Sequence, residues 1–234
     1  MQPDASAVER FPALAAIPAC RHAFIRRIPG IEVSYEKAEV LARLDAAHRE
    51  IRRSLAMDRG SFLTAQQVHR DRIAVIDRPA ASDECFSECD GLITNQPEVC
   101  LGIYVADCCA IFLVDPIRGC VGLVHSGKKG TELGIVSRAI AQMRESFGSV
   151  PADLVVQLSP CIRPPHYEIN FAAEIARQCR EAGVTAVHDC NICTACDLDR
   201  YYSYRAKKGR TGRMLALLDL ASSRAQSRDP LVHP

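Results

Sequence analysis

Three short apolar runs follow one another in the middle of the chain, each long enough to form a strand. They cover residues 99–106, 110–114 and 120–124. β-Branched and aromatic residues are frequent in them, and polar turns separate them. Because the runs are almost continuously apolar rather than alternating, we expect strands that are covered on both faces. Cys108 and His125 stand at the ends of these runs, where a buried sheet meets its rim.

Further elements are predicted on both sides of these runs. Apolar residues recur at helical spacing in 34–57, 131–147 and 171–182. Shorter β-prone runs cover 62–69, 72–76 and 153–158. His69 therefore also falls at the end of a predicted strand.

The ends of the chain differ from its middle. Residues 1–20 contain three prolines and no clear periodicity, which indicates an N-terminal arm that could be flexible. Residues 222–234 are polar and are expected to fray as a C-terminal tail. Between them, no shift in composition marks a linker, so we expect residues 21–221 to form a single domain.

Composition and charge narrow the class of protein. The chain has 234 residues, of which 48% are hydrophobic and 24% charged, with a formal charge of +1. These values favour a globular fold and give no electrostatic reason to expect nucleic acid or an anionic membrane as a partner, so a small molecule is the default ligand. No signal peptide or membrane-spanning run is present, which predicts a cytoplasmic protein. No feature indicates an oligomeric state.

Because thiols stay reduced in the cytoplasm, we interpret the twelve cysteines as free thiols, small hydrophobic residues or metal ligands rather than as disulfides. An isolated buried cysteine is most often only a packed thiol. Three candidate residues at strand ends, His69, Cys108 and His125, make a functional interpretation more attractive. Two imidazoles and one thiolate would give zinc three ligands and leave a fourth position for water or substrate. Alternatively, Cys108 could be a nucleophile with His125 as its general base.

A series of short motifs then resembles one known family, the YfiH-type laccase domain family. In chain order they are Gln67-Val68-His69, Asp90-Gly91-Leu92-Ile93-Thr94, Ala106-Asp107-Cys108, His125-Ser126-Gly127-Lys128-Lys129-Gly130, Pro160-Cys161-Ile162, Tyr167-Glu168-Ile169, Cys193-Thr194, Ser203-Tyr204-Arg205 and Thr211-Gly212-Arg213. The resemblance covers about Thr64 to Leu220. It implies an α/β fold, a four-layer α/β/β/α sandwich with mixed sheets that is shared with the Cys-His catalytic domain of a bacterial cytotoxin. It also implies a zinc site formed by His69, Cys108 and His125.

The resemblance also implies a function. Members of the family were first described as polyphenol oxidases and later as purine nucleoside enzymes, and one branch is linked to peptidoglycan editing. We therefore expect a zinc-dependent enzyme that cleaves adenosine, inosine or guanosine with phosphate and deaminates adenosine. A copper-dependent polyphenol oxidase is the alternative, although seven histidines are few for blue and trinuclear copper centres. A peptidoglycan-editing or catalytically lapsed member is a third possibility.

Departures from the family's pattern concern the substrate pocket. Lys128 and Lys129 stand where the family usually has tryptophan and arginine, and Ser159 replaces a glycine. A lysine offers no ring for a purine to stack on, and it lacks the bidentate fork of arginine. We expect Lys129 to bind the phosphate, with Arg205 as a second candidate.

One further group of cysteines has a spacing that resembles a metal-binding motif. Cys190, Cys193 and Cys196 are spaced like part of an iron–sulfur motif, but the fourth cysteine is missing. Cys193-Thr194 already belongs to a family motif that needs no cluster. We therefore favour the interpretation without a metal there.

Overall fold

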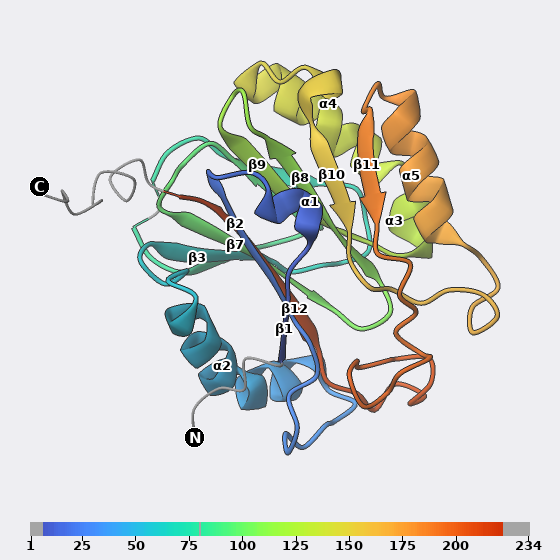
Figure 1. The fold of residues 1–234 in the computed structure, drawn as a ribbon. Coiled ribbons are helices and arrows are strands. Elements are labelled where there is room, and N and C mark those ends of the chain that lie inside the picture. The colour runs from blue at the N-terminus through green and yellow to red at the C-terminus, as the bar shows by residue number, and fades with distance from the viewer. Residues whose placement is uncertain (1–6, 80, 222–234) are drawn as a thin grey trace, which may run out of the picture.

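The computed structural model describes residues 7–79 and 81–221. Figure 1 shows two β-sheets packed against each other, with α2 on the outer face of one sheet and α4 and α5 on the outer face of the other. This arrangement confirms the expected α/β/β/α sandwich. No helix in the described ranges is long and apolar enough to cross a membrane.

The first sheet has six strands in the order β1-β2-β12-β7-β3-β5. Their bounds are β1 Val8–Glu9, β2 Cys20–Ile25, β12 Met214–Leu220, β7 Val99–Val105, β3 Ser61–Ala65 and β5 Glu84–Phe86. Strands β1, β2, β12 and β7 pair antiparallel, whereas β7, β3 and β5 pair parallel. The sheet is therefore mixed, as expected.

The second sheet also has six strands, in the order β11-β10-β8-β9-β6-β4. Their bounds are β11 Ala186–Asp189, β10 Val155–Leu158, β8 Cys109–Asp115, β9 Cys120–Ser126, β6 Gly91–Thr94 and β4 Ile73–Ile76. The β10/β11 and β4/β6 pairs are parallel and the other pairs are antiparallel. This sheet is mixed as well.

The described helices include those of the outer layers and two short ones. They are α1 Pro12–Ala15, α2 Lys37–Ser54, α3 Lys128–Glu132, α4 Ile135–Phe147 and α5 Phe171–Glu181, together with a 3-10 turn at Pro151–Asp153. In α4 the buried residues recur at helical spacing, which gives the helix one apolar face toward the second sheet. The interior of the sandwich lies between the two sheets and is the largest apolar cluster.

Strand β8 shows why the central runs are so apolar. Ala110, Phe112 and Val114 pack into the cluster between the sheets. Cys109, Ile111 and Leu113 pack into the cluster under α4 and α5. Both faces are covered, as the continuous apolar pattern predicted. The three central runs do not share one sheet, however, because β7 belongs to the first sheet and β8 and β9 to the second. Cys108 lies in the link that crosses from one sheet to the other.

Residues 7–20, which we expected to belong to an N-terminal arm, pack into the fold. Phe11 and Leu14 are buried in the cluster between the sheets, and β1 pairs with β2. Short elements of this kind leave no periodic signal, because one turn of helix buries only one or two side chains. Residues 1–6 and the C-terminal tail 222–234 lie outside the described residues.

Candidate metal centre and its cavity

The structure brings His69, Cys108 and His125 together from three separate parts of the chain. His69 lies in the loop after β3, Cys108 in the link between β7 and β8, and His125 near the end of β9. One ligand atom from each lies within 4.8 Å of the other two. The two imidazole rings meet edge to face, with 4.8 Å between their centroids. We call these three residues the His-Cys-His cluster.

A buried carboxylate that the sequence did not single out holds two of these residues in place. Asp90 is fully buried, and its Oδ1 lies 2.8 Å from Nδ1 of His125. The same carboxylate accepts hydrogen bonds from the backbone N–H groups of Val68, His69 and Arg70 at 2.8–3.1 Å. Asp90 therefore fixes both the orientation of the His125 ring and the path of the loop that carries His69.

The loop before His69 is held in an uncommon backbone conformation. Gln67 and His69 have φ values of +63° and +62°, in the left-handed region that non-glycine residues rarely adopt. The side-chain NH₂ of Gln67 donates to the backbone carbonyl of Tyr104 at 2.5 Å, and its Oε1 accepts from the backbone N–H of Tyr104 at 3.1 Å. These bonds to β7 and those to Asp90 offset the strain of the loop.

The link that carries Cys108 is anchored just as closely. Asp107, also at positive φ, accepts hydrogen bonds from the Thr194 hydroxyl and the Arg205 N–H, both at 2.7 Å. On the other side, an added Cβ on Gly127 would lie 2.7 Å from Sγ of Cys108. A glycine is therefore required at residue 127 for the thiol to lie where it does. Asp107 explains why the motifs at 193–194 and 203–205 belong to the same site.

The electrostatics of the cluster favour a thiolate. Burial raises the pKa of Cys108, but the neighbouring His125 and His69 outweigh this effect and lower that pKa to about 6. Burial lowers the pKa of His125, but Cys108 and Asp90 outweigh it and raise that pKa to about 9. A thiolate is the form of cysteine that binds metals, so a metal binding here would displace the proton of His125 rather than that of Cys108.

A cavity of about 590 Å³ opens beside the cluster, and all three of its residues line it. Four cationic side chains share the lining, namely those of Lys37, Lys128, Arg205 and Arg213. Aromatic rings complete the wall, those of Tyr104, Tyr167, Phe171 and Tyr204. Asp107 is the one acidic residue in the lining, and its two oxygens already accept the hydrogen bonds described above. The cavity is therefore suited to an anionic ligand with an aromatic part.

Two of these cations, Arg205 and Arg213, differ in their hydrogen-bond and ion-pair partners. Arg205 forms an ion pair with Glu168 at 3.0 Å and lies over the Tyr167 ring, 4.7 Å from its centroid. Arg213 donates only to the carbonyls of Thr211 and Gly212 and has no carboxylate partner in the described part of the chain. Arg213 belongs to one of the motifs but was not predicted to bind phosphate, and it is thus the cation more available to an anion.

Lys129, expected to bind phosphate, does not line this cavity, whereas its neighbour Lys128 does. Both residues begin α3, and both are exposed. Adjacent side chains on a helix point about 100° apart, so only one of the two can face the cavity. Arg205, the second candidate, does line it.

The donor set fits a transition metal. Two imidazole nitrogens and one thiolate sulfur suit zinc or copper, and nothing in the ligand set alone separates these ions. Within residues 7–79 and 81–221, this cluster is the only group of three or more histidine, cysteine or carboxylate ligands close enough to hold an ion. Cys190, Cys193 and Cys196 do not make such a group in those ranges, nor does any further set of histidines of the kind that a multi-copper arrangement needs.

Known proteins resemble this chain in both sequence and fold. The family described as "Multi-copper polyphenol oxidoreductase laccase" matches residues 29–174 and 166–221. A purine nucleoside phosphorylase of Clostridium acetobutylicum is 29% identical over 179 residues, covering 65% of this chain and 74% of that protein. One of Deinococcus radiodurans is 30% identical over 216 residues, covering 81% and 79%. YlmD of Geobacillus stearothermophilus shares the fold, with a TM-score of 0.79 and 22% identity over 94% of this chain and 98% of that one.

Proposed function

Because the chain belongs to the family of multi-copper polyphenol oxidoreductase laccases, and because its relatives are named purine nucleoside phosphorylases, we propose that it is a metal-dependent purine nucleoside phosphorylase. The observation that carries this proposal is the single cavity shared by the His-Cys-His cluster, four cations and four aromatic rings. Its volume of about 590 Å³ lies within the range typical of small-molecule sites. A nucleoside and a phosphate ion are ligands of the required size and charge.

The cations provide the phosphate site. Arg213 lacks a carboxylate partner among the described residues, and Lys128 stands beside the cluster at the start of α3. Charge-assisted hydrogen bonds from these groups would hold the phosphate dianion and direct one of its oxygens toward the sugar. That oxygen forms a bond to the anomeric carbon while the bond from this carbon to the purine nitrogen breaks. The purine leaves with the bonding electron pair and takes up a proton.

The aromatic rings provide the purine site. Tyr167 and Phe171 meet edge to face, with their centroids 5.9 Å apart, and Tyr104 and Tyr204 complete the lining. Stacking on such rings would compensate for the tryptophan that the family usually carries and this chain lacks. We therefore infer that the replacement at Lys128 alters the pocket without removing its ability to hold a purine.

The cluster itself would hold the metal. Asp90 accepts the Nδ1 proton of His125, so Nε2 of that ring would coordinate the metal after losing its own proton. A metal bound by His69, Cys108 and His125 would supply Lewis-acid stabilisation of negative charge beside the bound substrate. We propose zinc rather than copper, because the described residues offer only one three-ligand group.

Hydrolytic deamination of adenosine is a second reaction that this cavity could support. The same metal cluster and the same purine wall would serve it, without the phosphate. We propose it as a side activity of the one site. It is recognised by the conversion of adenosine to inosine in phosphate-free buffer.

The test is direct. Protein loaded with zinc is incubated with inosine in the presence and absence of phosphate, and hypoxanthine and ribose 1-phosphate are quantified. We expect both products in equal amounts, only with phosphate, and none from the Cys108→Ala variant. Oxygen uptake with phenolic substrates by copper-loaded protein, without phosphate-dependent hypoxanthine formation, would show instead that the enzyme is an oxidase.

A further inference from the structure

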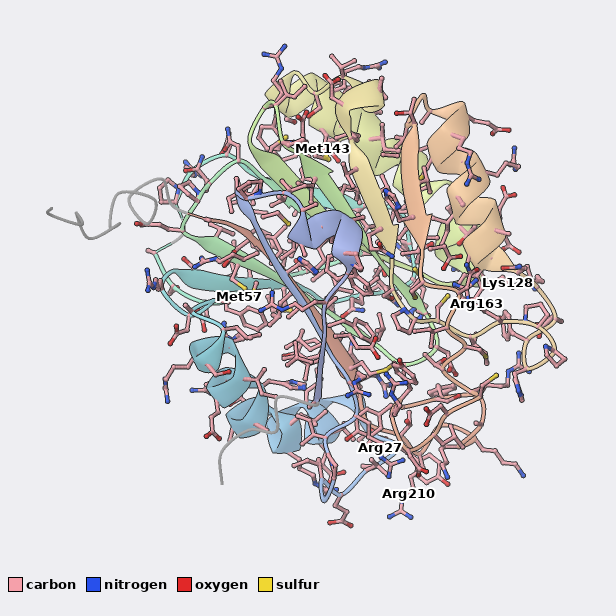
Figure 2. All side chains as sticks on the ribbon, viewed as in Figure 1. Arg27, Met57, Lys128, Met143, Arg163 and Arg210 are labelled. Carbon is pink, nitrogen blue, oxygen red and sulfur yellow. The ribbon has the colours of Figure 1, made fainter. Side chains whose placement is uncertain are left out.

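A second cavity, of about 320 Å³, is lined in part by residues 201–213. The same segment also borders the candidate active site. Tyr204, Arg205 and Arg213 of this segment line the first cavity, whereas Lys207 and Arg210 line the second. The remaining cation of the second cavity is Arg27, which follows β2. Figure 2 shows Arg27 and Arg210 near each other at the lower edge of the molecule, away from Lys128.

The second cavity has an excess of positive charge. Arg27, Lys207 and Arg210 line it, and no acidic residue does. None of the three forms an ion pair in the part of the chain that the structure describes. Arg27 donates to the carbonyl of Leu198 at 2.6 Å, and Arg210 donates to that of Val33 at 3.3 Å. Three like charges around one hollow repel one another unless an anion lies between them, so the arrangement favours binding of an anion.

A buried hydroxyl in the same wall points independently to a ligand. Thr211 is only 1% exposed, and its side-chain oxygen has no hydrogen-bond partner among the described residues. Its backbone N–H is already bound to the carbonyl of Ser34, so the hydroxyl is the group that lacks a partner. Buried polar atoms without a partner are rare in folded proteins. Since Thr211 lines the cavity, a ligand there is a candidate partner for this oxygen.

The size and rim of the cavity indicate what kind of anion fits. A volume of about 320 Å³ lies at the lower end of the range for small-molecule sites and exceeds what a lone ion needs. Tyr35 lines the cavity with a side chain that is 67% exposed, which leaves its ring open to stacking. We propose that this cavity is a second ligand site, separate from the metal cluster, that binds the phosphate group of a small phosphate monoester such as a mononucleotide.

The experiment compares charge reversals at residues that line the cavity with one at a neighbouring residue that does not. Wild-type protein, the Lys207→Glu/Arg210→Glu variant and the Lys208→Glu variant are titrated with AMP, and separately with inorganic phosphate, by calorimetry. Lys208 is also exposed but does not line the cavity, so it is the matched control. Because each lost charge-assisted contact weakens binding by about tenfold, the double variant should bind at least about a hundredfold more weakly at one site. The control should bind as the wild type does.

A third variant tests the hydroxyl. Thr211→Val keeps the shape of the side chain and removes its oxygen, so binding of the same ligand should weaken severalfold. Loss of this one site for both AMP and phosphate in the double variant would show that phosphate alone is recognised there, and loss of the site for AMP only would show that the nucleoside contributes. Binding to the cavity beside the His-Cys-His cluster should remain in every variant. Unchanged binding in the double variant, or an equal loss in the Lys208 control, would overturn the proposal. Phosphorolysis of inosine should continue in the double variant, so the outcome is independent of the proposed catalytic function.

Discussion

The strongest single test of the site's architecture is the substitution Asp90→Asn. The Asp90 carboxylate accepts four hydrogen bonds, from the ring of His125 and from the N–H groups of Val68, His69 and Arg70. Each of its two oxygens accepts two of them. An asparagine of the same shape keeps one acceptor and turns the other into an NH₂ group that faces donors. Two hydrogen bonds and the negative charge are therefore lost in a fully buried position.

The size of the effect follows from these bonds. A hydrogen bond to a buried charged group contributes about 1.5–3 kcal/mol, so the loss of two should lower the free energy of unfolding of the metal-free protein by about 3–6 kcal/mol. Metal affinity should fall by about 10- to 100-fold as well, because Asp90 orients His125 and the loop of His69. Urea denaturation measures the first quantity, and competition with a chromophoric chelator measures the second.

Asp115→Asn is the matched control. Asp115 is also fully buried, but its Oδ1 alone accepts the N–H groups of Ile117 and Arg118, and its Oδ2 has no partner among the described residues. An asparagine can keep both bonds, so we expect a small change in stability and none in metal affinity. If Asp90→Asn bound the metal as tightly as the Asp115 variant, Asp90 would not be the residue that organises the site.

Three further predictions concern the cavity and the thiol. Replacing Lys128 by alanine should raise the KM for phosphate by about tenfold. Lys129 does not line the cavity, so Lys129→Ala should leave this KM unchanged. Equal effects of the two substitutions would contradict the assignment of Lys128 to the phosphate site. The rate of alkylation of Cys108 in metal-free protein, followed by mass spectrometry of its peptide, should be half-maximal near pH 6. The reason is that the lowered pKa of Cys108 leaves its thiolate populated above that pH. A midpoint near the ordinary thiol pKa of about 8.5 would contradict this prediction. Gly127→Ala should weaken metal binding, since the added Cβ would lie 2.7 Å from the Cys108 sulfur. An unchanged metal affinity in chelator competition would show that the backbone at residue 127 shifts at little energetic cost.

Some parts of the fold carried a clear local signal and others did not. The apolar runs of β8 and β9 predicted strands buried on both faces, because every residue of such a strand must be apolar or paired. Strands β2 and β12 were not predicted, although both lie in the centre of the first sheet. Their pairing joins Cys20–Ile25 to Met214–Leu220 across almost the whole chain, and no local pattern reports a partner so distant.

The site shows the same division. The positions of His69, Cys108 and His125 at the ends of predicted strands indicated that they could meet, and the structure places them together. The role of Asp90 could not be recognised, because Asp-Gly is an ordinary turn signal and the bonds of its carboxylate reach residues 20–35 positions away. Sequence motifs thus identified the three residues of the cluster, but only the three-dimensional structure identified the residue that holds two of them in place.

We infer that two imidazoles and one thiolate hold a metal ion beside the cation-lined cavity. X-ray absorption spectroscopy of the zinc-loaded protein tests it most directly, because sulfur and nitrogen neighbours of the ion scatter differently. We predict one bound zinc per chain with one sulfur and two histidine nitrogen neighbours, and loss of the sulfur signal in Cys108→Ala. A zinc ion surrounded by oxygen and nitrogen alone, or a sulfur signal that survives this substitution, would contradict the account.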